Sequence, residues 1–426
     1  MERYDMMRDS GRPWLGQVPK HWKILRMKNV FEVVSERNHP DAEVLSLYRE
    51  YGVLPKNSRD DNHNVTSEDT ASYKFVRVDD LVINKMKAWQ GSLGISQYEG
   101  IVSPAYYVCR FINNEVSKRY YHYLLRSRTY AQEFERLSTG MRVGQWDLGI
   151  DDFMAVPALI PPIEEQQAIA SYLDDQVAKI DSTIAEAQAS IEEYKQWKAS
   201  IVHEAVTKGL DSDIQMRDSG IDWIGKIPES WPVRKIKHGF SIFSGATPKS
   251  DVSEYWDGDV VWVTPADYKT EDKYVSRGRR NLSDNGYSSC GTTIVPAGSI
   301  IFSKRAPVGT VAINSIPLCT NQGCLSCVPN NTAESEYFYY AMSAFTEQFE
   351  LFSSGTTFKE ISATTFANFE MMFPSVSDQK RISEFLAQKC SEIDSIRKEK
   401  QALINEMEVY KRSLIYEAVT GKRKVV

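Results

Sequence analysis

The chain has 426 residues, of which 42% are hydrophobic and 25% charged, so it is long enough to form about two to four domains with sizeable cores. Its net charge of −6 excludes a basic surface over the whole molecule, so binding of nucleic acid requires local basic groups or charge supplied by partners. Six cysteines indicate reduced thiols rather than a disulfide framework. We find neither an apolar run long enough to span a membrane nor the apolar segment of a signal peptide, and therefore expect a cytoplasmic protein.

The first segment of the chain is a short lead-in that occurs twice. It contains MRDSG at residues 7–11, followed by a tryptophan, a glycine and a proline, and it ends at Trp22. The same pattern returns 209 residues later, from Met216 to Trp231. Repeats of this kind indicate that the chain contains two copies of one structural unit.

Each lead-in precedes a stretch in which short β-type runs alternate with Gly, Pro, Asn and Asp. These stretches are residues 23–160 and 232–373, and each contains one predicted short helix, at 118–136 and at 335–352. The pattern predicts two α+β domains of mainly β character.

Polar and basic residues in the predicted loops are the candidates for contacts with nucleic acid. Each domain has a polar loop with a central glycine, at Ser138–Arg142 and at Ser353–Thr357, whose N–H and hydroxyl groups suit phosphates. Lysine and arginine also bind phosphates, and glutamine pairs with adenine in a major groove. The candidates in the first domain are Lys85, Lys87, Trp89, Gln90, Arg142 and Gln145. The candidates in the second domain are Thr264, Lys304, Arg305, Gln322, Thr356, Thr357 and Lys359. For any single one of them, a solvated surface loop is the alternative.

The longest feature is a helix-forming segment, Ile163–Gly209, that also occurs twice, with an offset of 213 residues. Its apolar residues recur at steps of mostly three and four, so they form one seam along a helix on the order of 65 to 70 Å long. With a single apolar stripe, the two copies are expected to pack on each other as an antiparallel coiled coil. The predicted seam residues are Ile169, Leu173, Ile180, Ile184, Ile191, Trp197, Ile201, Ile382, Leu386, Ile393, Ile404 and Leu414. The second copy has Arg397 and Lys400 where the first has Ile184 and Ala187, and the seam is expected to loosen or shift there.

These repeats divide the chain into a first domain at 1–160, a first helix at 161–209, a second domain at 210–373 and a second helix at 374–426. The second helix, with Ser377 as its expected N-cap, has no further lead-in after it. If the two halves are related by a pseudo-twofold axis, the C-terminus lies near the first lead-in. The arrangement is then cyclic, with a globular domain at each end of the coiled coil.

The chain contains no Walker, dinucleotide-binding, zincin or hydrolase motif. Pro265–Asp267 followed by Glu271–Lys273 imitates the acid pair and lysine of a metal-dependent nuclease, but this tight spacing is typical of a single loop. Asp61–Asn64 contains a histidine without a partner cluster and is expected to be a solvated loop.

Four cysteines have a spacing that occurs in one class of iron–sulfur protein. Cys319, Cys324 and Cys327 follow the C-x4-C-x2-C pattern, and Cys290 is a possible fourth ligand. The alternative, which we favour, is that they fill an apolar strand as small hydrophobic residues.

Beyond these motifs, the chain as a whole resembles the specificity subunits of type I restriction–modification systems. The resemblance rests on the duplicated lead-in, on the loop-to-helix junction Ala158–Ala170 and on its second copy, and it covers nearly the whole chain. Segments that look like one target-recognition subtype are Phe243–Pro248, Val261–Asp267 and Thr320–Gln322. Segments that look like another are Leu45–Tyr48, Asn84–Met86 and Gly100–Tyr106.

The resemblance implies two target-recognition domains, each reading one half of a bipartite double-stranded DNA sequence. It implies a coiled coil that sets the half-site spacing and docks two DNA adenine methyltransferase subunits. It also implies that two motor-nuclease restriction subunits join this assembly. S-adenosylmethionine, ATP and Mg2+ would then belong to these partners, and this chain is expected to be non-catalytic and to hold no cofactor or metal. The alternatives are a DNA-cleaving restriction enzyme and a coiled-coil scaffold without DNA recognition.

Overall fold

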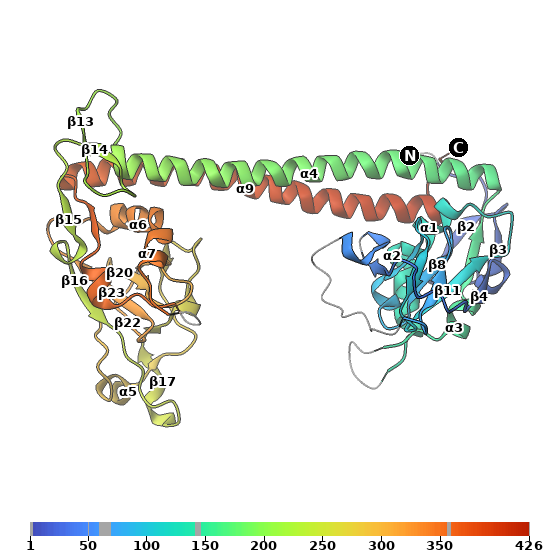
Figure 1. Cartoon of the computed structure of the whole chain (residues 1–426), viewed down its shortest axis with the longest axis horizontal. Helices are drawn as coiled ribbons and strands as arrows, with labels where there is room; N and C mark the ends of the chain where they lie inside the picture. Colours follow the sequence, from blue (N-terminus) through green and yellow to red (C-terminus); the bar gives the residue numbers. More distant parts are fainter. Residues whose placement is uncertain (1–2, 50, 59–69, 141–145, 356–358, 426) are drawn as a thin grey trace. The chain divides into compact units, whose positions relative to one another are not determined.

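The computed structural model describes residues 3–49, 51–58, 70–140, 146–355 and 359–425. The chain forms two compact units (Figure 1): unit 1 consists of Met1–Gln188 and Gln401–Val426, and unit 2 of Ala189–Lys400. Two long helices, α4 (Ile163–Lys208) and α9 (Val376–Val419), each contribute to both units. In the described part of the chain, no helix has the length and apolar character needed to cross a membrane.

Unit 1 is built on an antiparallel sheet with the strand order β4-β11-β8-β9. Alternate residues of its strand β8 enter different cores, with Leu81 and Ile83 in the main core and Val82 in a smaller one. The strands of this unit are β1 (Met7–Asp9), β2 (Gln17–Pro19), β3 (Lys23–Arg26), β4 (Phe31–Val34), β5 (Leu45–Tyr48), β6 (Gly52–Pro55), β7 (Lys74–Val76), β8 (Leu81–Asn84), β9 (Leu93–Ile95), β10 (Gly100–Val102), β11 (Tyr106–Phe111) and β12 (Pro157–Ile160). Its shorter helices are α1 (Lys118–Arg126), α2 (Arg128–Leu137) and α3 (Ile150–Ala155).

Unit 2 repeats this plan with the order β16-β23-β20-β21-β19, in which only β19 runs parallel to its neighbour. Its strands are β13 (Met216–Asp218), β14 (Lys226–Pro228), β15 (Val233–Lys235), β16 (Phe240–Ser244), β17 (Trp256–Val260), β18 (Trp262–Val263), β19 (Tyr274–Val275), β20 (Ile300–Ser303), β21 (Val311–Asn314), β22 (Cys319–Thr320), β23 (Cys324–Pro329) and β24 (Glu370–Met372). Its shorter helices are α5 (Asp284–Ser288), α6 (Ser335–Ala344), α7 (Thr346–Leu351) and α8 (Ala363–Ala367). The α+β class with mainly β domains and long helices is confirmed.

The two short helices expected at 118–136 and 335–352 are each broken in the middle. Ser127 is extended, with φ −62° and ψ 147°, and its hydroxyl donates to the Leu124 carbonyl at 2.7 Å. The break turns the chain between α1 and α2, and Phe345 occupies the corresponding junction between α6 and α7. The sequence pattern missed both breaks because helix-compatible residues continue across them.

The long helices pack antiparallel within each unit. In unit 1, Arg423 donates to the Tyr172 hydroxyl at 3.1 Å, whereas Asp181, further along α4, pairs with Lys411, earlier on α9, at 2.6 Å. The ion pairs of unit 2 run in the same sense. The predicted antiparallel pairing is therefore present in both units.

Most of the predicted seam residues lie in the interior. The buried ones are Ile169, Leu173, Ile180, Ile382, Leu386, Ile393, Ile404 and Leu414, and the half-buried ones are Ile184, Ile191 and Ile201. Trp197 was assigned wrongly, because 52% of it is exposed. Its neighbour Lys198 faces α9 instead and pairs with Asp394 at 2.6 Å.

The glutamine that recurs at the start of each long helix joins the helix to the domain before it. Gln166 is fully buried, accepts a hydrogen bond from the Ser117 N–H at 2.7 Å and donates to the carbonyls of Glu115 and Pro161, each at 2.8 Å. Gln379 makes the same set of bonds in unit 2. These buried bonds explain why this glutamine is one of the positions shared by the two copies.

A buried tyrosine in each domain also binds the end of the long helix that comes from the other repeat. Tyr120 of α1 donates to the Val419 carbonyl at 2.9 Å, and Tyr337 of α6 donates to the Val206 carbonyl at 3.1 Å. Each unit thus contains the start of one long helix and the end of the other.

The end of the chain packs on the first lead-in, as the repeat order predicts. Lys422 donates to the carbonyls of Leu15 and Gln17 at 2.7 and 3.1 Å. The N- and C-termini are marked close together in Figure 1. In unit 2, the end of α4 continues directly into the second lead-in, so both units contain the same parts.

The three closely spaced cysteines of unit 2 are small buried hydrophobic residues, whereas Cys290 is half-buried. Cys319, Cys324 and Cys327 belong to three different apolar clusters. All are free thiols, and burial raises the pKa of Cys319 to about 11 and that of Cys324 to about 12. The iron–sulfur interpretation is wrong, because side chains in separate cores cannot bind one cluster.

Candidate nucleic-acid interface

Several predicted contact residues of unit 2 come from loops that meet at one edge of the domain. Thr247 donates to the side-chain oxygen of Gln322, and the Lys304 N–H donates to the Gly323 carbonyl at 2.9 Å. A Cβ at Gly245 would lie 2.2 Å from the carbonyl oxygens of the Thr320–Asn321 turn, so only glycine allows this approach. The structure therefore brings Gln322, Lys304 and Arg305 into one group of loops.

A single carboxylate binds the two basic residues of this group. Glu360 pairs with Lys304 at 3.0 Å and with Arg305 at 2.8 Å. Burial raises the pKa of the Glu360 carboxyl, but the hydrogen bonds from the two cations outweigh it, and the net pKa is lowered. Glu360 also makes a two-bond backbone bridge with Ser354, which ties the glycine loop to the end of β20 through Lys304.

We call this arrangement a loop frame: a lysine at the end of the central strand, paired with a carboxylate residue whose backbone is bridged to the glycine-containing loop. Unit 1 has an equivalent loop frame at the end of β8. Lys85 pairs with Asp147 at 3.5 Å, and its carbonyl accepts from the Leu148 N–H at 3.0 Å. Asp147 makes the same two-bond backbone bridge, here with Thr139. The ring of Trp89 lies 5.3 Å from that of Trp146, centroid to centroid.

The remaining candidates are placed less uniformly. Lys87 and Lys359 are exposed, and Gln90 is half-buried in a short 3-10 turn. Thr264 has a structural role, because its hydroxyl donates to Asp267 and accepts from the Ala266 N–H. Four candidates lie outside the described residues: Arg142, Gln145, Thr356 and Thr357. Asp61–Asn64 also lies outside them.

The acids of the nuclease-like segment bind different partners. Asp267 accepts from the Thr264 N–H at 2.8 Å and from the Arg279 N–H at 3.0 Å. Asp272 accepts from the Lys269 N–H at 3.0 Å, and Lys273 pairs with Glu336. In the described ranges, no three His, Cys, Asp or Glu side chains gather as a metal site would require.

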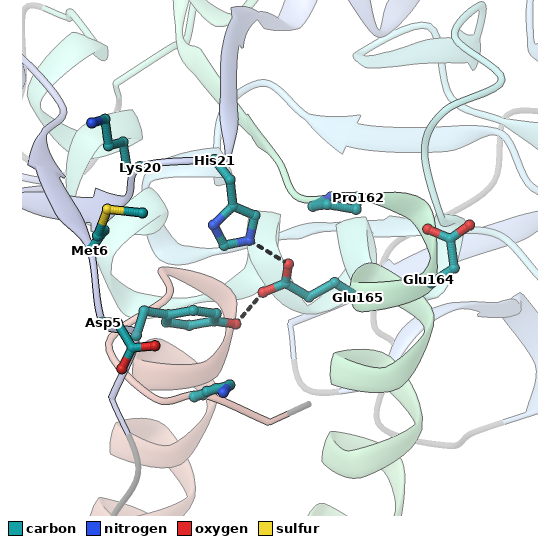
Figure 2. A pocket seen from close by; sticks show the side chains of 9 residues that line it. Asp5, Met6, Lys20, His21, Pro162, Glu164 and Glu165 are labelled. Carbon is teal, nitrogen blue, oxygen red and sulfur yellow. Dashed lines mark hydrogen bonds and ion pairs between the residues drawn. The ribbon is translucent and has the colours of Figure 1, made fainter.

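A cavity of about 610 Å³ lies where α4 begins in unit 1. Figure 2 shows Glu165 at its wall, where its carboxylate binds His21 at 2.8 Å. The same carboxylate accepts from the Tyr4 hydroxyl and from the Trp22 indole N–H, the latter at 3.0 Å. Burial and the bond to Glu165 raise the pKa of Tyr4. In unit 2 the residues at the places of His21 and Glu165 are Ser230 and Asp378. This cluster fixes the first lead-in to α4 and is specific to unit 1.

Sequence reasoning missed Asp147, Glu360 and Trp146, which complete the two loop frames. The signal that could have found the acids is the 213-residue offset of the long helices, which also places Asp147 on Glu360 and Leu148 on Ile361. The pairing itself was not visible, because each acid lies more than fifty residues from its lysine.

Together, two equivalent β-rich domains, matched loop frames and antiparallel helices define a protein built from two copies of one structural unit. The family model for the type I restriction modification DNA specificity domain matches residues 19–193 and 228–406. The chain therefore belongs to this family, with two copies of its domain, which is the composition of a type I specificity subunit.

Curated relatives carry the same description. The specificity subunit of the type I restriction enzyme MjaIX of Methanocaldococcus jannaschii is 38% identical over 183 residues, which span 42% of this chain and 42% of that relative. The putative MjaX specificity subunit of the same organism is 24% identical over 434 residues, or 96% of each chain.

Solved structures share the fold. A chain from a structure of a type I R-M system aligns with a TM-score of 0.75 at 15% identity, over 94% of this chain and 98% of that one. The HsdS subunit of Thermoanaerobacter tengcongensis aligns with a TM-score of 0.56 at 15% identity, over 95% and 98%.

Proposed function

We propose that the chain reads a bipartite double-stranded DNA site, with one target-recognition domain on each half-site and the long helices setting the distance between them. The observation that carries the proposal is the matched loop frame, in which the same strand end and the same ion pair support different side chains. Unit 1 presents Lys87, Trp89 and Gln90, whereas unit 2 presents Arg305 and Gln322. Two equivalent loop frames that present different side chains to DNA suit two different half-sites.

The experiment is to map methylated adenines across the genome of a host that expresses this chain with its methyltransferase. Replacing residues 23–160 by those of a relative should change one half-site and leave the other half-site and the spacing intact. Gln90→Ala and Gln322→Ala should each relax one position, in different half-sites, because a lost bidentate contact costs about 1 to 3 kcal/mol of base discrimination. An unchanged methylated sequence after the domain replacement would favour the scaffold alternative.

We further propose that the long helices dock two DNA adenine methyltransferase subunits, to which two motor-nuclease restriction subunits are added. An exposed aromatic residue stands at the same repeat position in each unit, with Trp197 exposed by 52% and Tyr410 by 42%. Exposed aromatic residues are frequent anchors of protein interfaces, and two equivalent anchors suit two copies of one partner. Trp197→Ala and Tyr410→Ala should each reduce the assembly to one methyltransferase by native mass measurement, and unchanged stoichiometry in the double variant would refute this docking site.

In this proposal, S-adenosylmethionine, ATP and Mg2+ act in the partner subunits, and this chain determines the DNA sequence on which they act. The test is to incubate the purified chain with DNA and Mg2+, first alone and then with the methyltransferase. Cleavage by the chain alone would instead support the restriction-enzyme alternative.

A further inference from the structure

Each loop frame contains one carboxylate where a DNA-binding surface would be expected to be basic. Asp147 and Glu360 stand at the same place in the two units, each in a backbone bridge to the glycine loop and each paired with the lysine that follows the central strand. The acids are half-exposed to partly buried, with 50% of the Asp147 side chain and 34% of the Glu360 side chain accessible. The residues around them differ between the units, but this charge pair does not.

The carboxylate changes what the lysine offers to DNA. Contacts with phosphates provide most of the sequence-independent affinity of a protein for duplex DNA. A lysine already paired with a carboxylate must lose or share that partner before it neutralises a phosphate, and the fixed negative charge repels the phosphate as well. In unit 2 the effect extends to Arg305, which binds the second oxygen of Glu360.

We propose that Asp147 and Glu360 are specificity-determining positioning residues, which suppress sequence-independent binding by occupying the cations of the two loop frames. At a matching site, base contacts offset the cost of exchanging the carboxylate for a phosphate. At a non-matching site nothing offsets it. The inference rests on the proposed reading of DNA by both domains and adds the groups that limit binding elsewhere.

The test uses the full chain assembled with its methyltransferase, because that is the form proposed to bind DNA. Asp147→Asn and Glu360→Gln remove the charge but keep the backbone bridges. Each should raise the affinity for a non-matching duplex of mixed sequence by roughly two- to fivefold, the range of an exposed ion pair. Each should also steepen the dependence of log affinity on log salt by up to about 0.9, as for one more neutralised phosphate. The affinity for the matching duplex, identified by methylation mapping, should rise less because the lysine is no longer oriented.

The charge-conserving variants Asp147→Glu and Glu360→Asp should behave as the wild type. Glu115→Gln and Asp211→Asn remove acids that are at least as exposed and pair with Lys23 and Arg381 away from the loop frames, and they should leave both affinities unchanged. A loss of affinity for both duplexes in Asp147→Asn and Glu360→Gln would indicate a purely structural role and overturn the inference, as would an unchanged salt dependence. If the wild-type assembly does not distinguish the two duplexes, the proposed function itself fails, whatever the variants do.

Discussion

The two recognition domains differ in the side chains that they present and agree in the parts that hold those side chains. In unit 1, Trp89 packs against Trp146 beside Lys85, whereas in unit 2 Arg305 shares Glu360 with Lys304. Beneath these groups, the order of the four antiparallel strands, the backbone bridge to the glycine loop and the acid–lysine pair are the same, and unit 2 adds the parallel strand β19. The comparison teaches that the positions of the reading groups are set by the frame, so their chemistry is free to change between the domains.

The largest expected effect concerns the buried glutamines, which should be equally important in both units. Gln166→Leu and Gln379→Leu each remove three hydrogen bonds, one buried and two part-buried, and take the side-chain partner from one N–H and two carbonyls. Each should lower the free energy of unfolding by about 2 to 4 kcal/mol, measured by urea titration. Gln167→Leu, an exposed neighbour of Gln166, is the control and should change little. A large loss in only one unit would break the comparison.

A half-buried histidine should make unit 1 sensitive to pH in a way that unit 2 is not. His122 lies on α1, and burial together with the positive charge of Arg126 lowers its pKa to about 4. The position is Tyr339 in unit 2, whose pKa burial raises to about 12. Because the unfolded chain protonates His122 near its ordinary pKa of 6.5, its contribution is complete above pH 6.5 and falls as the pH decreases toward 4.

The predicted loss is at most about 3 kcal/mol over that range. It should be measured as the difference in the free energy of unfolding between wild type and His122→Gln at several pH values. The stability of the wild type relative to the variant should decrease as the pH falls, since glutamine does not titrate. Parallel curves between pH 7 and pH 4 would show that His122 is protonated as easily in the folded protein as in the unfolded chain.

The internal repeat is the feature of the sequence that predicted most of the fold. It predicted the order of the elements, the antiparallel helices and the C-terminus beside the first lead-in, because two copies in one chain restrict how the ends meet. It could not show how the domain loops meet, since Lys85 and Asp147 are brought together only by the sheet and the glycine loop.

Local patterns were less reliable where two solutions have nearly the same energy. Ser375 and Ser377 are both acceptable caps, and in the structure the Ser375 hydroxyl accepts from the Asp378 N–H at 3.2 Å, so Ser377 was the wrong choice. Trp197 fits the helical period, but the period does not say that the ion pair of Lys198 takes its place against α9.

A smaller effect is expected for the tyrosines that hold the helix ends. Tyr120→Phe and Tyr337→Phe keep the buried ring and remove one hydrogen bond each, to Val419 and Val206. Each should cost about 1 kcal/mol of stability, and the two losses should agree within error in thermal unfolding. Tyr410→Phe changes an exposed side chain and is the control. A loss in Tyr410→Phe as large as in the buried pair would show that the hydroxyl bonds to the helix ends are not what is measured.

The smallest effects are expected for the equivalent ion pairs between the long helices, where the units should differ in a defined way. Lys198–Asp394 and Lys411–Asp181 both measure 2.6 Å and are partly exposed, so double-mutant cycles should give coupling of only about 0.2 to 1 kcal/mol, decreasing with added salt. Asp394 has a second cation, Arg397, at 3.3 Å. Removing Lys198 should therefore cost less than removing Lys411, because Arg397 still neutralises Asp394, whereas Asp181 has no such second partner among the described interactions. Equal costs for Lys198→Met and Lys411→Met would mean that Arg397 does not compensate for the loss of Lys198. The arginine that stands in the second helix at the position of Ile184 would then have no effect on the pairing of the helices.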